Sequence, residues 1–166
     1  MKFSELKYVR PDLTDFMEKI SSLIDELNIS KSMKEQMSLV EKINTVRNEF
    51  ETMRSIASVK YTQDTTNKNY QEEQDFFDRS SPLFSAASTD FYTVLLKSSF
   101  RKDLESVFGK QLFSIAEMSV KTFSYEIIGE LTDENLLTSE YVKLLAIAKI
   151  NFDGKELNLS QISPYL

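Results

Sequence analysis

Carboxylates along one predicted helix are the residues whose types and spacing come closest to a reactive site in this chain. The segment YQEEQDFFD, residues 70–78, carries Glu72, Glu73, Asp75 and Asp78. The last two lie three positions apart and would share one helical face, where they could supply oxygen ligands to a metal ion. Carboxylate metal sites in helical bundles usually add histidines, and this chain has none. We therefore interpret the segment as a solvated helix face.

The absence of histidine and cysteine excludes most other kinds of catalytic site. Without histidine or cysteine, the chain lacks the commonest general base, the commonest transition-metal ligand and any thiolate nucleophile. The glycines Gly109, Gly129 and Gly154 are too dispersed for a phosphate-binding loop. No serine lies in a GxSxG motif, or in an SxxK motif with the partners that its mechanism requires. The residues after Asp64 lack the glycine and the alternating ligands of an EF-hand. We therefore predict no catalytic residue and no metal ligand here, and the substrate-binding residues stay unknown.

Composition and charge place the chain among ordinary globular proteins. Its 166 residues, 41% hydrophobic and 28% charged, are enough for a core that needs no disulfide. The 20 basic and 26 acidic residues give a net charge of −6, which disfavours a nucleic-acid partner. The sequence contains no signal peptide and no apolar run of about 18 residues that would span a membrane. We expect a cytoplasmic protein with no nucleic-acid and no membrane partner.

Apolar periodicity predicts two helices in the first part of the chain. Over residues 12–27 the apolar side chains recur at steps of three and four, after the start signal Pro11-Asp12. A second start signal, SMKE, predicts a capping box in which Ser32 and Glu35 each accept from the other's backbone N–H. The long helix that follows could join an oligomeric coiled coil, but packing within one chain is favoured because other helices need the same partner. Its apolar stripe is Met33, Met37, Val40, Ile43, Val46, Phe50, Met53, Ala57 and Tyr61.

The middle of the chain leaves two questions open. The polar segment of residues 62–69 reads either as a turn or as the exposed end of the long helix. From residue 70 to 95 the aromatic and apolar residues recur at near-heptad spacing, interrupted only by Pro82. Either Ser80 or Ser81 caps a new helix there, or one helix runs through the proline and kinks. Tyr61 and Tyr70 fall on stripe positions, where core packing with the hydroxyl at the edge is expected.

The last third predicts shorter elements and a change of period. A short helix should end at Gly109 in a left-handed cap, and a further helix should occupy much of residues 125–145. Asp153-Gly154 suits a type I′ turn between runs of partly alternating pattern, so a β-hairpin is expected at about residues 146–160. The helix after Gly109 is expected to present one face made of Leu112, Ile115, Ala116, Ser119 and Phe123.

These patterns together predict a mainly α fold, an antiparallel multi-helix bundle with long helices and a small C-terminal β-hairpin. No internal repeat, low-complexity tract or flexible linker divides the sequence. We therefore expect residues 1–166 to form one helical region. By fold alone, such a bundle would be a free-standing helical protein-interaction module, and this remains the alternative reading of its function.

Four separated blocks, in the same order, resemble the N-terminal region of the oligoendopeptidase F family. They are MKFSELKYVRPDL, VRNEFETMRSIASVKYTQDTTNKNYQEEQDFF, FGKQLFSIAE and INFDGKELNLSQISPYL, and they span essentially the whole chain. The family comprises zinc metallopeptidases related to thimet oligopeptidase. Their zinc is held by a His-Glu-x-x-His helix and a downstream glutamate, whereas this chain contains no histidine onto which that motif could be mapped.

The resemblance implies a non-catalytic role for this chain. In the family, such a region precedes the catalytic domain and helps to wall a channel that admits short peptides. The implied partners are the missing C-terminal catalytic domain and, for the parent enzyme, short peptide substrates; zinc belongs to the parent and not to this chain. Ser163-Pro164 reads as the start of a further turn or helix that is not completed, so we expect a truncated part of a larger peptidase. Such a part would be inactive alone and could form a homodimer through exposed apolar surface.

Overall fold

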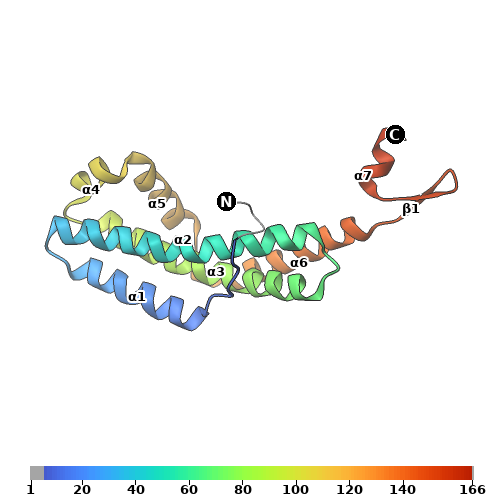
Figure 1. The fold of residues 1–166 in the computed structure, drawn as a ribbon. Coiled ribbons are helices and arrows are strands. Elements are labelled where there is room, and N and C mark those ends of the chain that lie inside the picture. Colours follow the sequence, from blue (N-terminus) through green and yellow to red (C-terminus); the bar gives the residue numbers. More distant parts are fainter. Residues whose placement is uncertain (1–5, 166) are drawn as a thin grey trace.

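The computed structural model describes residues 6–165 and shows a mainly helical bundle with a small hairpin, as predicted. The first three helices are antiparallel and lie side by side, and the later helices follow at one end and along one flank (Figure 1). α2 ends at Gln63, so the polar residues that follow form a turn. The elements are α1 (Leu13–Ile29), α2 (Met33–Gln63), α3 (Lys68–Lys97), α4 (Arg101–Phe108), α5 (Lys110–Thr122), η2 (Tyr125–Ile127), α6 (Ile128–Ile147), β1 (Ile150–Phe152), β2 (Lys155–Leu157), α7 (Leu159–Ile162) and η3 (Ser163–Tyr165).

The first two helices begin where the sequence predicts, but one cap differs. Asp12 caps α1, and its Oδ1 accepts from two backbone N–H groups of the first turn at 2.9 and 3.1 Å. Ser32 caps α2, and its Oγ accepts from the Glu35 N–H at 3.5 Å. The reciprocal half of the predicted capping box is wrong, because the Glu35 carboxylate accepts from the Ser30 hydroxyl at 2.6 Å instead.

An aromatic cluster forms the centre of the core. The Phe50 ring of α2 is fully buried and lies 4.9 Å from Phe16 of α1 and 4.9 Å from Phe84 of α3, measured between ring centroids. Phe77, two turns earlier on α3, meets the same ring edge-on at 5.4 Å. Because the α2 stripe packs on α1 and α3 of its own chain, the prediction of packing within one chain is confirmed.

Pro82 lies inside one continuous helix, which excludes the start of a new helix at that point. Proline has no N–H, so the carbonyl of Asp78, four residues earlier, loses its intrahelical donor. The structure supplies a substitute, because Asn135 Nδ2 of α6 donates to that carbonyl at 3.0 Å. The hydroxyls of Ser80 and Ser81 donate to carbonyls four residues back, at 2.8 and 2.6 Å, as side chains within a helix do, and cap nothing.

The junction of α4 and α5 differs from the prediction in two respects. Gly109 does have a positive φ of 87°, but its ψ of 154° places it outside the left-handed helical region, in a conformation that glycine alone adopts readily. The predicted face of α5 is correct for Ala116, which is fully buried, but wrong for Ile115, which is 46% exposed. The helix buries Phe113 in the hydrophobic core, and the Arg101 guanidinium carbon of α4 lies 5.7 Å from the centre of that ring.

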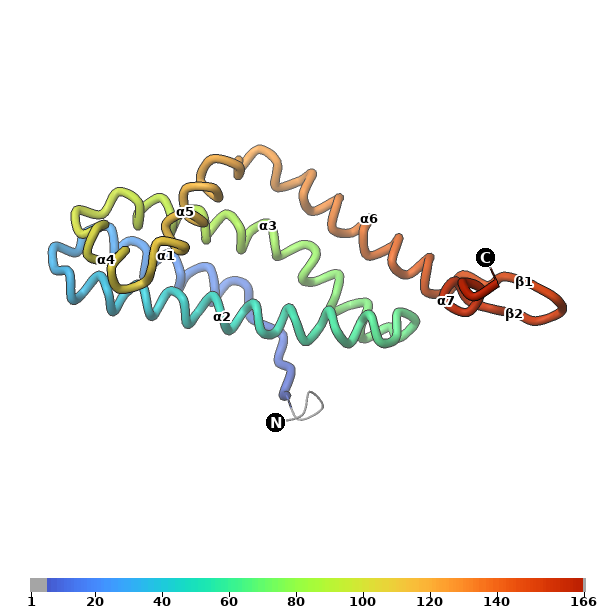
Figure 2. Tube along the Cα trace, turned by 90° about the horizontal axis from the view of Figure 1, so that it is seen from above, coloured from blue at the N-terminus to red at the C-terminus, as the bar shows by residue number. Residues whose placement is uncertain are grey.

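The C-terminal hairpin is confirmed, and it lies at the far end of α6 from the bundle (Figures 1 and 2). β1 and β2 are antiparallel, with Ile150 opposite Leu157. Asp153 and Gly154 have φ values of 50° and 71°, the two positive angles that a type I′ turn requires. Across residues 6–165 no helix combines the length and the apolar character needed to cross a membrane.

Candidate functional site

The acidic segment of residues 70–78 lies at the start of α3, but its carboxylates do not act as a group. Glu73 binds Arg10 through two hydrogen bonds of 2.9 Å, and Asp78 is only 6% exposed. The interpretation as a solvated face is therefore wrong for these two residues, although Glu72 and Asp75 are exposed. In the part of the chain that the structure describes, no three potential metal-ligating side chains come together.

Glu73 ties the segment before α1 to the two long helices. The Tyr8 hydroxyl and the Arg10 guanidinium both donate to its carboxylate, and Lys60 Nζ of α2 lies 5.2 Å from the centre of the Tyr8 ring. Burial would raise the pKa of Glu73, but the hydrogen bonds from Arg10 and Tyr8 outweigh it and hold the pKa below its ordinary value. Burial and the neighbouring carboxylate raise the pKa of Tyr8. This cluster is thus a structural tether with both of its charges paired.

A second polar cluster joins α6 to the bundle, and we call it the Asp78 clasp: Tyr61, Gln74, Asp78, Asn135 and Ser139. The Ser139 hydroxyl donates to Asp78 Oδ2 at 2.6 Å, and Gln74 Nε2 donates to Asp78 Oδ1 at 2.8 Å. The Tyr61 hydroxyl donates to the Ser139 carbonyl at 2.7 Å, and Asn135 binds the carbonyl freed by Pro82. The expectation that Tyr61 packs in the core is confirmed, since it is 5% exposed.

The clasp explains how a mostly exposed helix is held in place. Ser139 is the buried residue of α6, and its hydrogen bonds, with half-buried Leu131 and Leu136, fix this helix on α3. Burial raises the pKa of Asp78, while the hydrogen bonds from Ser139 and Gln74 oppose the shift. Both carboxylate oxygens already accept from protein donors, which leaves Asp78 closed to a substrate. The clasp is therefore positional and not catalytic.

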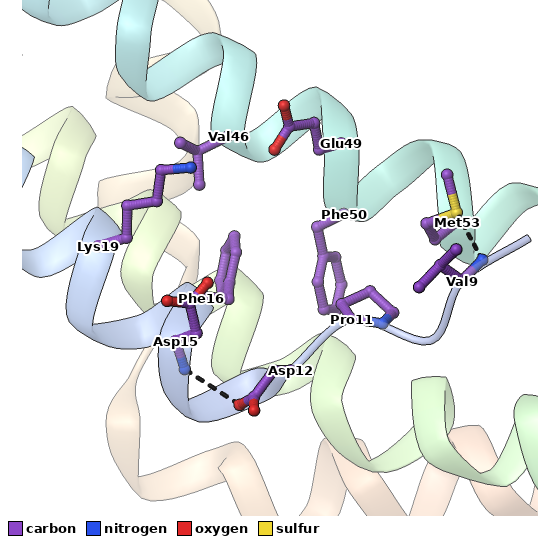
Figure 3. A pocket seen from close by; sticks show the side chains of 10 residues that line it. All are labelled: Val9, Pro11, Asp12, Asp15, Phe16, Lys19, Val46, Glu49, Phe50 and Met53. Atoms are coloured by element: carbon purple, nitrogen blue, oxygen red, sulfur yellow. Dashed lines mark hydrogen bonds between the residues drawn. The ribbon is translucent and has the colours of Figure 1, made fainter.

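A pocket of about 310 Å³ lies where the segment before α1 crosses α1 and α2 (Figure 3). Phe16, Val46 and Phe50 supply its apolar floor, while Lys19 extends from α1 toward α2 across the opening. Its other lining residues are Val9, Pro11, Asp12, Asp15, Glu49 and Met53.

The groups around this pocket permit binding but no reaction. Asp12 Oδ1 is engaged in capping α1, partly through the Asp15 N–H, and Met53 Sδ accepts from the Val9 N–H at 3.4 Å (Figure 3). None of the lining residues pairs a nucleophile with a general base, the arrangement that covalent catalysis needs. An apolar group could occupy the floor, with the charged side chains at the rim.

Exposed apolar surface is concentrated in the last third of the chain. Among residues 6–165, fourteen of the seventeen large apolar side chains that are exposed lie between Val107 and Tyr165. On α6, Leu137, Tyr141 and Leu144 are 60% to 65% exposed, and their spacing of four and three puts them on one face. A row of this kind typically marks a surface that packs against another folded part. This face of α6, which we call the α6 apolar row, is the strongest candidate for an interaction surface.

Three solved structures of larger proteins superpose closely on this chain. Pz peptidase A, solved with an inhibitor, superposes with a TM-score of 0.94 at 41% identity, over 99% of this chain and 29% of that chain. A proposed oligoendopeptidase F from Bacillus anthracis strain Ames superposes equally well at 41% identity, over 99% of this chain and 30% of that chain. A further oligoendopeptidase F structure matches at 40% identity with the same TM-score and 29% of its length. A search of curated proteins found no match.

The chain thus spans about three tenths of the length of the solved proteins that it resembles. The oligoendopeptidase F assignment of two of them agrees with the resemblance carried by the four sequence blocks. The family model described as Peptidase M3 N-terminal domain matches residues 3–123, which is most of the sequence. This chain therefore belongs to the Peptidase M3 N-terminal domain family.

Proposed function

We propose that residues 1–166 act as the non-catalytic N-terminal region of an oligoendopeptidase F-like zinc metallopeptidase in the cytoplasm. In this role the chain helps to wall the channel through which short peptides reach the zinc, and its partner is the C-terminal catalytic domain. The α6 apolar row carries the proposal, because Leu137, Tyr141 and Leu144 form a face that the bundle itself does not cover. The relatives, more than three times as long, have the additional protein that could cover it.

The side chains of this region do not suit the zinc of such an enzyme. The chain has neither histidine nor cysteine, and its best-placed carboxylates are engaged. Glu73 binds Arg10, and Asp78 binds Ser139 and Gln74. The metal and the residues that activate water would therefore come from the catalytic domain, while this chain supplies enclosure. A homodimer of the isolated region, through the same apolar row, would be a consequence of the missing partner.

A chimera tests the proposal directly. In the Bacillus anthracis relative, the segment that matches this chain is replaced by residues 1–166, and hydrolysis of a fluorogenic short peptide is measured with and without a chelator. We expect chelator-sensitive turnover from the chimera and none from the isolated chain. Turnover by the isolated chain, or full activity of the relative after simple deletion of the segment, would contradict the proposal.

Matched lysine variants test the α6 apolar row within the chimera. Leu137→Lys with Leu144→Lys places two charges on the row, and Ile29→Lys places one on a more exposed apolar residue at the end of α1. If the catalytic domain packs on α6, the double variant loses activity and thermal stability, whereas Ile29→Lys leaves both unchanged. If both variants have the same activity and thermal stability, α6 is not part of the interface.

A further inference from the structure

Arg47 of α2 is a half-buried arginine without a carboxylate partner. Its Nε donates to Ser88 Oγ at 3.2 Å, and its terminal nitrogens donate to Tyr92 Oη at 2.6 Å and to Asn44 Oδ1 at 3.1 Å. The guanidinium carbon also lies 4.8 Å from the centre of the Tyr92 ring. None of the ion pairs found within residues 6–165 includes Arg47. Its neighbours thus orient the positive charge without neutralising it.

The hydroxyl groups that accept from Arg47 have hydrogens of their own to donate. Ser88 and Tyr92 each use an oxygen lone pair to accept from Arg47, so each hydroxyl keeps its own hydrogen for a separate acceptor. Both residues are 6% exposed, and in the described part of the chain no acceptor takes either hydrogen. These hydrogens need an acceptor from outside the protein, either water or a bound ligand. The cluster is therefore a set of donors that lacks an acceptor.

The same groups line a pocket with room for a ligand. It holds about 290 Å³ between α2, α3 and α5, and Ser119 and Thr122 of α5 add hydroxyls to its wall. No acidic residue is among the lining residues. A pocket that combines a positive charge with hydroxyl donors and no carboxylate favours an anion over a cation or a neutral base.

We propose that this pocket binds a small carboxylate, such as acetate or the C-terminal carboxylate of a short peptide. Arg47 has five N–H groups, of which three are engaged, so two remain and join the hydroxyl hydrogens of Ser88 and Tyr92. These donors can pair with the oxygens of a carboxylate, and the single positive charge of Arg47 matches its one negative charge, whereas phosphate carries about two negative charges at pH 7. The inference does not depend on the proposed function, because every donor belongs to this chain.

NMR titration of the isolated chain tests the site. The Nε–Hε signal of Arg47 is followed while acetate, trialanine, trialanine amide or inorganic phosphate is added. We expect acetate and trialanine to shift this signal with dissociation constants on the order of 1 mM, whereas the amide and phosphate bind at least tenfold more weakly. No shift with acetate, an equal response to the amide, or tighter binding of phosphate would each overturn the carboxylate assignment.

Three variants assign the binding to these residues. Arg47→Met removes the charge and should abolish binding, while Tyr92→Phe keeps the ring and the charge but removes one donor and should weaken binding about tenfold. Arg54→Met is the matched control, because Arg54 lies on the same helix and is paired with Glu51 at 2.6 Å. If Arg47→Met fails to fold, Tyr92→Phe decides the question. Unchanged affinity in Tyr92→Phe, or equal loss in Arg54→Met, would refute the site.

Discussion

Replacing Asn135 by alanine removes the donor that compensates for Pro82. In the native protein, Asn135 Nδ2 binds the Asp78 carbonyl at 3.0 Å, and the proline supplies no backbone N–H to that oxygen. Asn135→Ala therefore leaves a carbonyl at the α3–α6 contact without a protein donor. Pro82→Ala restores an N–H four residues after Asp78, so the loss of Asn135 should matter much less in that background.

The size of the effect follows from the environment of this bond. An unpaired buried acceptor costs about 1–3 kcal/mol, and since Asn135 is only half-buried, we expect Asn135→Ala to destabilise the native protein by about 1–2 kcal/mol. In the Pro82→Ala background the same change should cost about 0.5 kcal/mol or less, a coupling of about 1 kcal/mol between the two positions.

The native protein, Asn135→Ala, Pro82→Ala and the double variant form a double-mutant cycle. Urea denaturation of each, followed by circular dichroism, measures it. The free energies of unfolding give the cost of Asn135→Ala with and without Pro82. Asn135→Gln serves as a control, because it keeps the amide donor on a longer side chain. If Asn135→Ala costs the same in both backgrounds, the amide does not replace the missing backbone donor and the explanation of the proline is wrong.

Three further predictions concern other parts of the bundle. Because burial raises the pKa of Asp78 above 3.8, the folded state binds that proton more tightly than the unfolded state, and stability is lost as the pH rises from 3.8 through the folded pKa. Asparagine carries no such proton, so the free energy of unfolding of Asp78→Asn should rise relative to that of the native protein as the pH increases over this range. Urea titrations at several pH values measure this difference. Phe50→Ala should lower the free energy of unfolding by about 3–5 kcal/mol, because three rings lose their common neighbour. Gly109→Ala should cost about 1–3 kcal/mol through its positive φ, whereas Gly129→Ala, in the first turn of α6 with open space around the added carbon, should add about 0.5 kcal/mol or less in the same assay.

Local patterns were sufficient to predict most elements of this fold. The apolar steps of three and four located α1 and α2, and Asp153-Gly154 located the hairpin, because both signals lie within a few residues of the structure that they specify. The continuity of α3 could not be read in the same way. Pro82 is tolerated with the help of Asn135, which lies far away in the sequence, and local rules contain no information about such a donor.

The candidate sites were harder to predict for the same reason. Asp78 resembles any acid on a charged helix until α6 packs over it and Ser139 binds its carboxylate. Ile115 and Phe113 lie two residues apart and fit competing stripes, and packing against the rest of the bundle decides which of them is buried. The donors around Arg47 come from α2 and α3, and nothing in the local sequence shows that they meet. Sites assembled from distant segments need the folded structure.

The position of the Asp78 clasp along α6 gives this helix the mechanics of a lever. Its fulcrum is Ser139, and the arm beyond it runs for about 12 Å to Ile147 before the hairpin begins. A small rotation at the fulcrum would therefore become a larger displacement of the hairpin, which lies beyond the ends of α1, α2 and α3 (Figure 2). Directional hydrogen bonds resist such tilting where loosely packed apolar contacts would slide, so a handful of polar atoms sets where the hairpin points.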